Sequence, residues 1–394
     1  MVRRAWRRTP RSPGAGTVTS SRRSTARSTD HADRHPKSRC RLTPTETAPM
    51  DCGTFLLLQS PGGQDHAEVF ARATEMTQAA DRLGFDSVWC AEHHFSTYGY
   101  LSRPLMFAMH LAAQTERIRV GSAVVVLPLH HPLVVAEEIA TADLLSGGRL
   151  DVGLGRGYQK YEFERLGHTL DESRERFDES VDILLKAFEG EPFSHEGKHY
   201  CFDETSIFPM PIQRPHPPFW MVGQSPESIV ATAKRGFNLI SGGFGIPIER
   251  LAEFRQTFDR AIPDQAQRDS IRVSTQRPVY VTHDESELPE IVEQARWNMR
   301  VTLSLRQGLA RVDHGRAVAI PFDEEPSVED LLDRYFVVGT PDTCIEKIKQ
   351  LREVMGIDHF NANFWFGNLS QKQILKSMNL FAEEVLPLMK SGEV

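Results

Sequence analysis

The sequence predicts an α/β protein built as a (β/α)8 TIM barrel, with insertions after strands four and seven and a disordered basic extension in front. Two observations carry this prediction. Strand-like and helix-like runs alternate along residues 50–394 until eight strands, each followed by a helix, have been counted, as a barrel of parallel strands requires. Titratable and glycine-rich segments follow several of these strands, where such a barrel places its catalytic face.

Residues 1–49 differ in composition from the rest of the chain. They carry twelve Arg and Lys against three Asp and Glu, whereas the whole chain has a net charge of −7. They contain almost no aliphatic residues and cannot bury enough apolar surface to fold alone. We therefore predict a disordered Arg- and Ser-rich extension over 1–49 and one barrel domain over 50–394. The extension is compatible with translation from upstream of a true start at Met50, with a targeting segment or with a basic arm.

Composition also limits the partners and the compartment. No apolar run approaches the length of a membrane span, and no signal-peptide pattern is present. The five cysteines are scattered without a C-x-x-C pair, which is typical of thiols in a reducing compartment. Aromatic residues do not interleave with the basic ones, and the acidic body would repel phosphate. We expect a cytoplasmic protein with no membrane and no nucleic-acid partner.

The elements of the first half follow from periodicity and caps. A strand over 54–58 precedes a helix over 67–83, and a strand over 85–91 precedes a helix over 104–115. The run 118–127 is β-branched and mostly uncharged, which indicates a strand buried on both faces, as in a parallel sheet. Proline at the first position and glycine after the last residue delimit a helix over 132–146. The remaining predictions are strands over 149–155, 219–222 and 237–240 and helices over 173–188 and 226–235.

The second half continues the alternation less regularly. We predict helices over 251–261, 288–309, 341–355 and 371–389 and strands over 271–282 and 358–364. A barrel of this kind uses about 250 residues, so about 95 residues of the body belong to insertions. The candidates are residues 190–218 and the irregular stretch 313–333. Long connections of this kind can form lids, and we expect both to shape the substrate pocket.

The second strand ends in three adjacent titratable residues, Glu92, His93 and His94, within FDSVWCAEHHF. Histidine suits proton transfer because its pKa lies near the operating pH. A metal-dependent hydrolase using a histidine-rich set is the alternative; that set is His93, His94, His130, His131 and Asp151. Adjacent residues on a strand point to opposite faces, so this spacing is poor for two ligands of one ion. We predict no metal.

The segment after the fifth strand predicts an anion site. Ser225 occupies the position of a helix cap and Pro226 the first helical position, so we expect free amides of the first turn to face an anion. Arg156, at the end of the neighbouring strand, could pair bidentately with a phosphate. The alternative is an ordinary helix cap beside a surface arginine.

Three ordered motifs carry a family resemblance: EHHF, then GSAVVVLPLHHPLVVAEEIATADLLSGGRLDVGLGRGY, then VGQSPES. Together they resemble the bacterial-luciferase-like flavin-dependent monooxygenases over about residues 55–243, and more weakly at VVGTPDTCIEKIKQLREVMGIDHF. The resemblance implies an oxidoreductase that reacts reduced FMN with O2 to a C4a-hydroperoxyflavin and oxidises a small organic substrate. It also implies a separate flavin reductase and a homodimer. Long-chain aldehyde and light emission are not implied, because members differ in substrate.

The resemblance assigns residues one by one. It implies that His93 is catalytic and handles protons near the reactive flavin carbon, and that Ala123 and Val124 are joined by a non-proline cis peptide against the flavin. The implied cofactor-binding residues are Glu92, Ala123, Val124, Arg156, Gly157, Tyr158, Gln224, Ser225 and Ser228. One position departs from the pattern, because Gly155 stands where a well-known member has a cysteine. No thiol chemistry is expected there.

Two other functions stay open at this point. The first is a deazaflavin (F420)-dependent dehydrogenase or reductase on the same barrel, which would transfer hydride without oxygen. The second is a non-catalytic flavin-binding protein. The presence of both His93 and Arg156 argues against the second, and EHHF with the phosphate segment favours FMN over F420.

Overall fold

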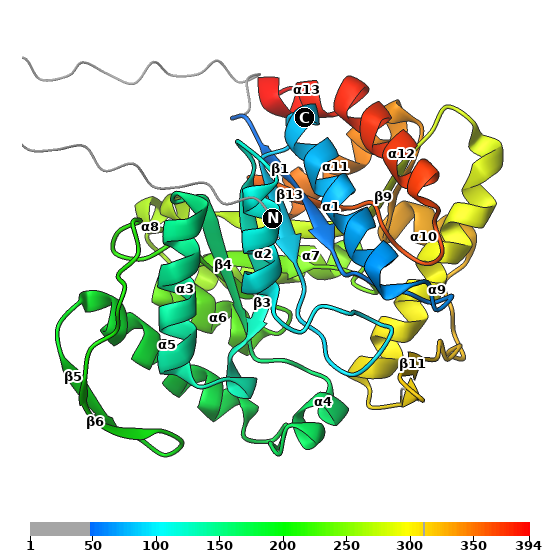
Figure 1. Cartoon of the computed structure of the whole chain (residues 1–394). Coiled ribbons are helices and arrows are strands. Elements are labelled where there is room, and N and C mark those ends of the chain that lie inside the picture. Colours follow the sequence, from blue (N-terminus) through cyan, green and yellow to red (C-terminus); the bar gives the residue numbers. More distant parts are fainter. Residues whose placement is uncertain (1–47, 310–311) are drawn as a thin grey trace, which may run out of the picture. The chain divides into compact units, whose positions relative to one another are not determined.

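Eight parallel strands close into a barrel in the computed structural model, which describes residues 48–309 and 312–394 (Figure 1). The predicted extension therefore lies almost entirely outside the described residues. The strands, in order around the barrel, are β1 (Asp51–Leu56), β2 (Ser87–Cys90), β3 (Arg119–Val126), β4 (Leu150–Gly155), β7 (Phe219–Val222), β8 (Asn238–Gly242), β9 (Val273–Val281) and β13 (His359–Asn363). Because β13 pairs back with β1, the sheet has no open edge in the ring. The predicted TIM barrel is confirmed.

Helices surround this barrel, as Figure 1 shows. The larger ones are α1 (His66–Leu83), α2 (Pro104–Ala113), α3 (Pro132–Ser146), α5 (Ser173–Glu189), α6 (Pro226–Arg235), α7 (Ile248–Ala261), α9 (Leu288–Arg306), α11 (Pro341–Met355) and α12 (Gln371–Glu384). The bounds of α3, α6 and α11 agree with the prediction, since a proline opens each and a left-handed glycine ends each. The predicted last helix is divided, because Pro387 opens a separate α13 (Leu386–Ser391).

A ninth strand, β12 (Val337–Gly339), was not predicted. It pairs in parallel with the last three residues of β9, Val279 to Val281. The first part of β9 pairs with β8 and β13 inside the barrel, and its last part pairs with β12. Three residues are too few for a periodic pattern to be visible in the sequence. The short helices α4 (Lys160–Arg165), α8 (Gln265–Ser270) and α10 (Val328–Arg334) were also missed, because each is less than two turns long. Helix α10 corrects part of the stretch 313–333, which was predicted to be irregular.

The two predicted insertion segments contain small hairpins. Strands β5 (Phe193–Glu196) and β6 (Cys201–Thr205) pair between α5 and β7, and β10 (Val312–Asp313) pairs with β11 (Arg316–Ala317) between α9 and β12. The second hairpin lies against the loop that follows β2, because the Thr97 amide donates to the Gly315 carbonyl at 2.7 Å. It therefore stands on the side where the barrel strands end.

Aromatic side chains fill the N-terminal part of the barrel. The rings of Trp89 and Trp220 lie 5.4 Å apart, and His359 is bonded to Ser87 and Ser274 at 2.9 Å each. Burial lowers the pKa of His359 to about 3, so this imidazole stays neutral inside the core. Since this end is packed, open space in the barrel is left at the C-terminal ends of the strands. No helix of the described chain is long and apolar enough to cross a bilayer.

Candidate active site

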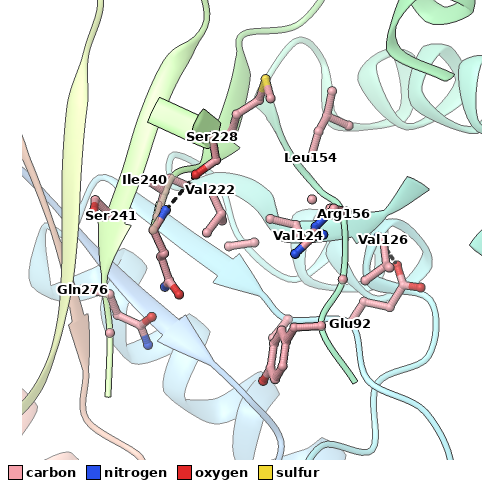
Figure 2. Close-up of a pocket in the computed structure, with 18 of the residues that line it drawn as sticks. Glu92, Val124, Val126, Leu154, Arg156, Val222, Ser228, Ile240, Ser241 and Gln276 are labelled. Carbon is pink, nitrogen blue, oxygen red and sulfur yellow. Dashed lines mark hydrogen bonds between the residues drawn. The ribbon is translucent and has the colours of Figure 1, made fainter. Parts of the chain in front are cut away.

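A cavity of about 340 Å3 lies at the C-terminal ends of the barrel strands (Figure 2). Its wall is built by residues of all eight barrel strands or of the segments that follow them, together with Thr302 and Arg306 of α9. All ten predicted site residues line it: Glu92, His93, Ala123, Val124, Arg156, Gly157, Tyr158, Gln224, Ser225 and Ser228. The structure therefore brings together in one place what the sequence distributed over almost 140 residues.

The Ala123–Val124 peptide is cis, as the resemblance implied. It lies where the pairing of β3 with β4 shifts register, between Ser122 and Val125. The Ser122 hydroxyl bridges the shift, because it donates to the Gly153 carbonyl at 3.0 Å and accepts from the Gly153 amide at 3.1 Å. A Cβ atom on Gly155 would lie 2.3 Å from Cγ2 of Val124. A side chain at position 155 would therefore overlap Val124, which explains the glycine there.

His93 is held by one of its two ring nitrogens. Nδ1 lies 2.8 Å from Nε2 of Gln159 and 3.3 Å from the Glu162 carboxylate, which also accepts the His94 amide at 2.8 Å. The ring stands edge-on to Tyr98 with centroids 4.7 Å apart. Nε2 of His93 has no hydrogen-bond partner among the described residues. A histidine fixed in this way can exchange a proton with a bound molecule through its free nitrogen.

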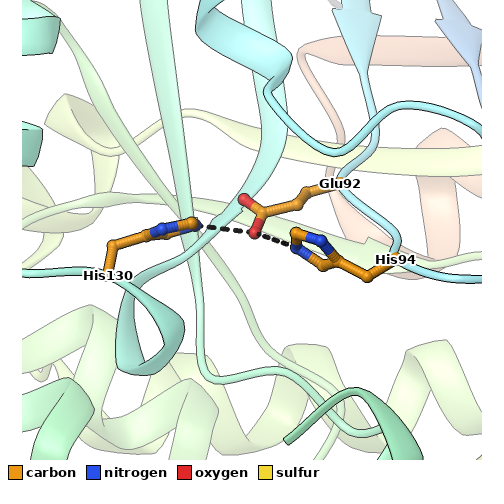
Figure 3. A group of neighbouring side chains, drawn as sticks. All are labelled: Glu92, His94 and His130. Atoms are coloured by element: carbon orange, nitrogen blue, oxygen red, sulfur yellow. Dashed lines mark hydrogen bonds and ion pairs between the residues drawn. The ribbon is translucent and has the colours of Figure 1, made fainter. Parts of the chain in front are cut away.

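Glu92 is the centre of a buried hydrogen-bond cluster (Figure 3). Its Oε1 accepts from Nε2 of His130 at 2.7 Å and from Nε2 of His94 at 2.9 Å, and its Oε2 accepts the Val126 amide at 2.9 Å. Burial alone would raise the pKa of this carboxyl, but the donors, led by His130 and His94, outweigh it and hold the pKa at about 2. Glu92 is therefore an ionised anchor between the ends of β2 and β3.

The same three side chains have the arrangement of a metal site, since their ligand atoms lie within 4.8 Å of one another. The position of the ring proton of His130 argues against a metal ion at this place. Arg103 lies 2.8 Å from Nδ1 of His130, and a guanidinium can only donate, so the ring proton of His130 is on Nε2 and points at Glu92. A protonated nitrogen has no lone pair for an ion.

The histidine set considered from the sequence is not assembled in the structure. Asp151 is bonded to Arg119 and to the indole nitrogen of Trp220, and Tyr200 packs on the ring of His131 at 5.5 Å. Of that set, only the rings of His94 and His130 share a partner, because both are hydrogen-bonded to Oε1 of Glu92. A metal-dependent hydrolase of the kind considered would need a different arrangement.

Two arginines without partners stand at another part of the wall. Arg156 follows β4 and Arg174 lies in the first turn of α5, and neither has a hydrogen bond or ion pair with residues 48–309 or 312–394. Burial, and then the positive charge of Arg174, lower the pKa of Arg156. Both side chains are exposed, as the alternative of a surface arginine expected, and Glu227 at the start of α6 lies close enough to Arg174 for the two charges to interact. That the pair holds an anion is part of the proposed function.

The start of α6 beside these arginines differs from the prediction. The Ser228 hydroxyl accepts the amides of Gln224 and Ser225 at 3.1 and 3.0 Å, and the Ser228 amide is bonded to the Ser225 hydroxyl. Pro226 has no amide proton. Of the first-turn amides, the capping box therefore uses that of Ser228, which contradicts the prediction there, whereas the Glu227 amide has no bond to another residue of the described chain. An anion here would be held by the two arginines and by serine hydroxyls that change partners.

Sequence reasoning missed six residues that line the cavity or fix its groups: Tyr98, Gln159, Glu162, Arg174, Thr302 and Arg306. Glu162 lies on α4, which is too short to be recognised, and Thr302 and Arg306 lie on α9. Nothing local distinguishes an arginine at the end of an amphipathic helix from any other helical arginine.

The family model described as "Luciferase-like monooxygenase" matches residues 50–359. Among curated proteins, the oxygenase component of the flavin-dependent trigonelline monooxygenase of Acinetobacter baylyi is 25% identical over 343 residues, covering 84% of this chain and 93% of that protein. Among solved structures, monooxygenase RslO1 from Streptomyces bottropensis is 27% identical with a TM-score of 0.74, covering 86% of this chain and 99% of that one.

Two more distant structures share the fold. The oxygenating constituent of 3,6-diketocamphane monooxygenase from Pseudomonas putida, solved in complex with FMN, has a TM-score of 0.69 at 22% identity and covers 86% of this chain and 98% of that one. An F420-dependent secondary alcohol dehydrogenase, solved with an F420–acetone adduct, has a TM-score of 0.68 at 16% identity with the same coverage.

Proposed function

The chain belongs to the luciferase-like monooxygenase family, and from that premise we propose that it uses reduced FMN and O2 to oxidise a small organic substrate. Family membership makes it an oxidoreductase of a flavin-dependent class. The observation that carries the finer proposal is the unpartnered pair Arg156 and Arg174 in the same cavity as His93, whose Nε2 is free. Such a cavity has an anchor for an anionic cofactor and a group that exchanges protons beside it.

The residues present fit a flavin phosphate. Arg156 and Arg174 would neutralise it, with the hydroxyls of Ser225 and Ser228 as further ligands. The walls of the cavity include apolar side chains such as Leu57, Val124 and Leu154, which exclude water from the reacting groups. Reduced FMN, when bound, supplies the activation of O2, and the protein supplies binding and orientation.

His93 would hold and move a proton at Nε2 while the side-chain amide of Gln159, which donates to Nδ1 at 2.8 Å, fixes its ring. Glu92 is a wall residue in this proposal, and its carboxylate keeps the ends of β2 and β3 together. A separate reductase would supply the reduced flavin, as the name of the trigonelline relative, an oxygenase component, suggests for this chain.

A homodimer is part of the proposal. Large apolar side chains are exposed on neighbouring helices: Met106 on α2 is 71% exposed, and Val134 and Leu145 on α3 are 50% and 70% exposed. Val134 and Leu145 are eleven residues apart, which places them on one face of α3. Glu138 and Thr141 lie between them on that face, so the surface is mixed. We propose that these exposed apolar side chains belong to an association surface whose partner is a second copy of the chain.

The phosphate anchor is tested by titrating the full chain with FMN and with F420. We expect FMN to bind, and Arg156→Ala to weaken it by at least tenfold, because a charge-assisted contact contributes about 1.5–3 kcal/mol. The control is Arg260→Ala, an exposed arginine on α7.

If Arg156→Ala binds FMN with the affinity of wild type and of Arg260→Ala, Arg156 does not belong to the phosphate site. A preference for F420 that Arg156→Ala abolishes would replace the proposal by the F420-dependent dehydrogenase, for which the fold neighbour gives a precedent. Absence of O2-dependent, substrate-dependent consumption of reduced FMN across a panel of small organic compounds would contradict the oxygenase chemistry.

A further inference from the structure

Arg306 in the last turn of α9 lines the cavity on the side of two tyrosines. Its guanidinium carbon lies 5.4 Å from the ring centroid of Tyr158. Within residues 48–309 and 312–394 it has neither a hydrogen bond nor an ion pair. Two other arginines of the same helix show the contrast, because Arg296 and Arg300 are both paired with Glu325. Arg306 is therefore a cation without a counter-charge.

Among the described residues, the three carboxylates that line the cavity are bonded to groups other than Arg306. Glu92 accepts from two histidines, Glu162 faces His93 and accepts the His94 amide, and Asp178 is paired with Arg235 at 2.9 Å. None of these three forms an ion pair with Arg306. The positive charge on this part of the wall is left for a bound molecule.

The hydroxyl groups beside Arg306 have no free protons. The Thr302 hydroxyl donates to the Asn298 carbonyl at 2.9 Å, so its oxygen must accept from Tyr98, which lies 2.9 Å away. Tyr98 in turn accepts from Tyr158 at 3.3 Å. Burial raises the pKa of both tyrosines, so neither adds a negative charge at neutral pH. Arg306 is thus the group on this wall that has donors to offer to an anion.

We propose that Arg306 binds an anionic group of the substrate and that the substrate class is a small aromatic carboxylate. This inference rests on the proposed function, which assigns Arg156 and Arg174 to the cofactor. The guanidinium can take a carboxylate through two parallel N–H bonds. Phe55, Leu57 and Tyr98 line the same cavity and offer apolar and aromatic surface to a planar ring.

The experiment measures binding of benzoate and of its neutral isostere benzamide to the full chain by calorimetry. Saturating inorganic phosphate is present throughout, so that the site at Arg156 and Arg174 is filled. We expect Arg306→Gln to weaken benzoate at least tenfold, which corresponds to about 1.4 kcal/mol, and Arg306→Lys to recover part of the loss. Benzamide should bind wild type and Arg306→Gln alike, which also reports that the pocket is folded.

The matched control is Arg82→Gln, which removes an exposed arginine from the last turn of α1. It should leave benzoate binding unchanged. Benzoate that does not bind wild type, or that binds Arg306→Gln with equal affinity, would overturn the proposal. So would benzoate that binds only when phosphate is left out, because it would then occupy the arginine pair.

A separate FMN titration distinguishes the two levels of inference. If FMN does not bind while benzoate binding still depends on Arg306, the proposed function fails and the anion site remains. If FMN binds and benzoate binding ignores Arg306, the proposed function stands and the substrate assignment fails.

Discussion

Glu92 and His93 are neighbours in the chain, yet their hydrogen-bond partners give them different properties. Both carboxylate oxygens of Glu92 are occupied by donors, which keeps it ionised and fixed. His93 is held at Nδ1 only. At this scale a titratable residue is a candidate for chemistry when part of its hydrogen-bonding capacity is free and for structure when all of it is used.

His93→Ala should keep FMN affinity within about twofold and lower turnover of a substrate by roughly 100-fold or more, because general acid–base catalysis contributes about that much. The measurement is a flavin titration beside a steady-state assay with supplied reduced FMN. His283→Ala, on an exposed surface histidine, is the control. Turnover retained in the His93 variant would show that another group moves the proton.

Glu92→Gln should destabilise the fold at neutral pH. The pKa of Glu92 is lowered from 4.5 to about 2 in the folded chain, so its ionised form contributes stability above about pH 4.5, and that contribution is lost as the pH falls towards 2. The shift corresponds to roughly 3 kcal/mol at pH 7. The free energy of unfolding from urea titrations at pH 7 and pH 3 should therefore differ less in the variant than in wild type.

The control for this measurement is Glu346→Gln, whose carboxylate is 72% exposed. It should follow the wild-type pH dependence, since exposed ion pairs contribute little. If Glu92→Gln and wild type lose stability in parallel between pH 7 and pH 3, the carboxylate is not the anchor that its contacts indicate.

At the scale of the elements, the pairing of β3 with β4 positions much of the wall. At the register shift, the Ser122 hydroxyl bonds to the backbone of Gly153 where a regular ladder would have backbone–backbone bonds. The next residue, Ala123, is joined to Val124 by the cis peptide. Close approach at this point requires small residues, because a Cβ on Gly153 would lie 2.2 Å from the Ser122 carbonyl oxygen. Three glycines in the run from Gly153 to Gly157 are explained by this packing and by the left-handed backbone of Gly157, whose φ is 78°.

Gly155→Ala should lower the free energy of unfolding by about 1–3 kcal/mol, because its methyl group would overlap Val124 and a β-branched side chain has little room to rotate away. In a Val124→Ala background the same substitution should cost less. Urea unfolding of the four proteins gives this coupling as a double-mutant cycle. The control is Gly62→Ala, where a Cβ meets only the side-chain ends of Asn368 and Gln64. Additive effects at 124 and 155 would show that the overlap is relieved by other shifts.

At the scale of the whole molecule, the packed N-terminal half of the barrel and the helices around it leave two surfaces for interaction. One is the cavity at the C-terminal ends of the strands. The other, where we propose the dimer interface, is the part of α2 and α3 that exposes Met106, Val134 and Leu145. Since α3 follows the strand that contains the cis peptide, an interface on α3 would also support the wall of the cavity.

Leu145→Lys should convert a dimer into a monomer at micromolar concentration, because it would place a charge in an apolar interface. Sedimentation equilibrium of the full chain measures the association. Leu166→Lys, on a partly exposed leucine after α4, is the control and should leave the dimer intact. A wild-type chain that is monomeric at this concentration would contradict the proposed homodimer.

Local signals were enough for the eight barrel strands, for the helices with proline and glycine at their ends and for the ordered motifs that suggested the flavin site. Periodicity, caps and turns act over a few residues, so the sequence alone can reveal them. The contacts that give the site its chemistry act over longer separations. Glu92 meets His130 across 38 residues and His93 meets Glu162 across 69.

Only barrel closure decided these contacts, the pairing of β12 and the unpartnered state of Arg306, whereas the capping box of α6 is a local contact between Ser225 and Ser228. A residue's charge and hydrogen-bonding capacity are visible in the sequence. Whether that capacity is used or left free depends on which distant groups the closed sheet brings within about 3 Å. The sequence thus determined the barrel and the candidate residues, and the tertiary structure decided which of them remain available for a ligand.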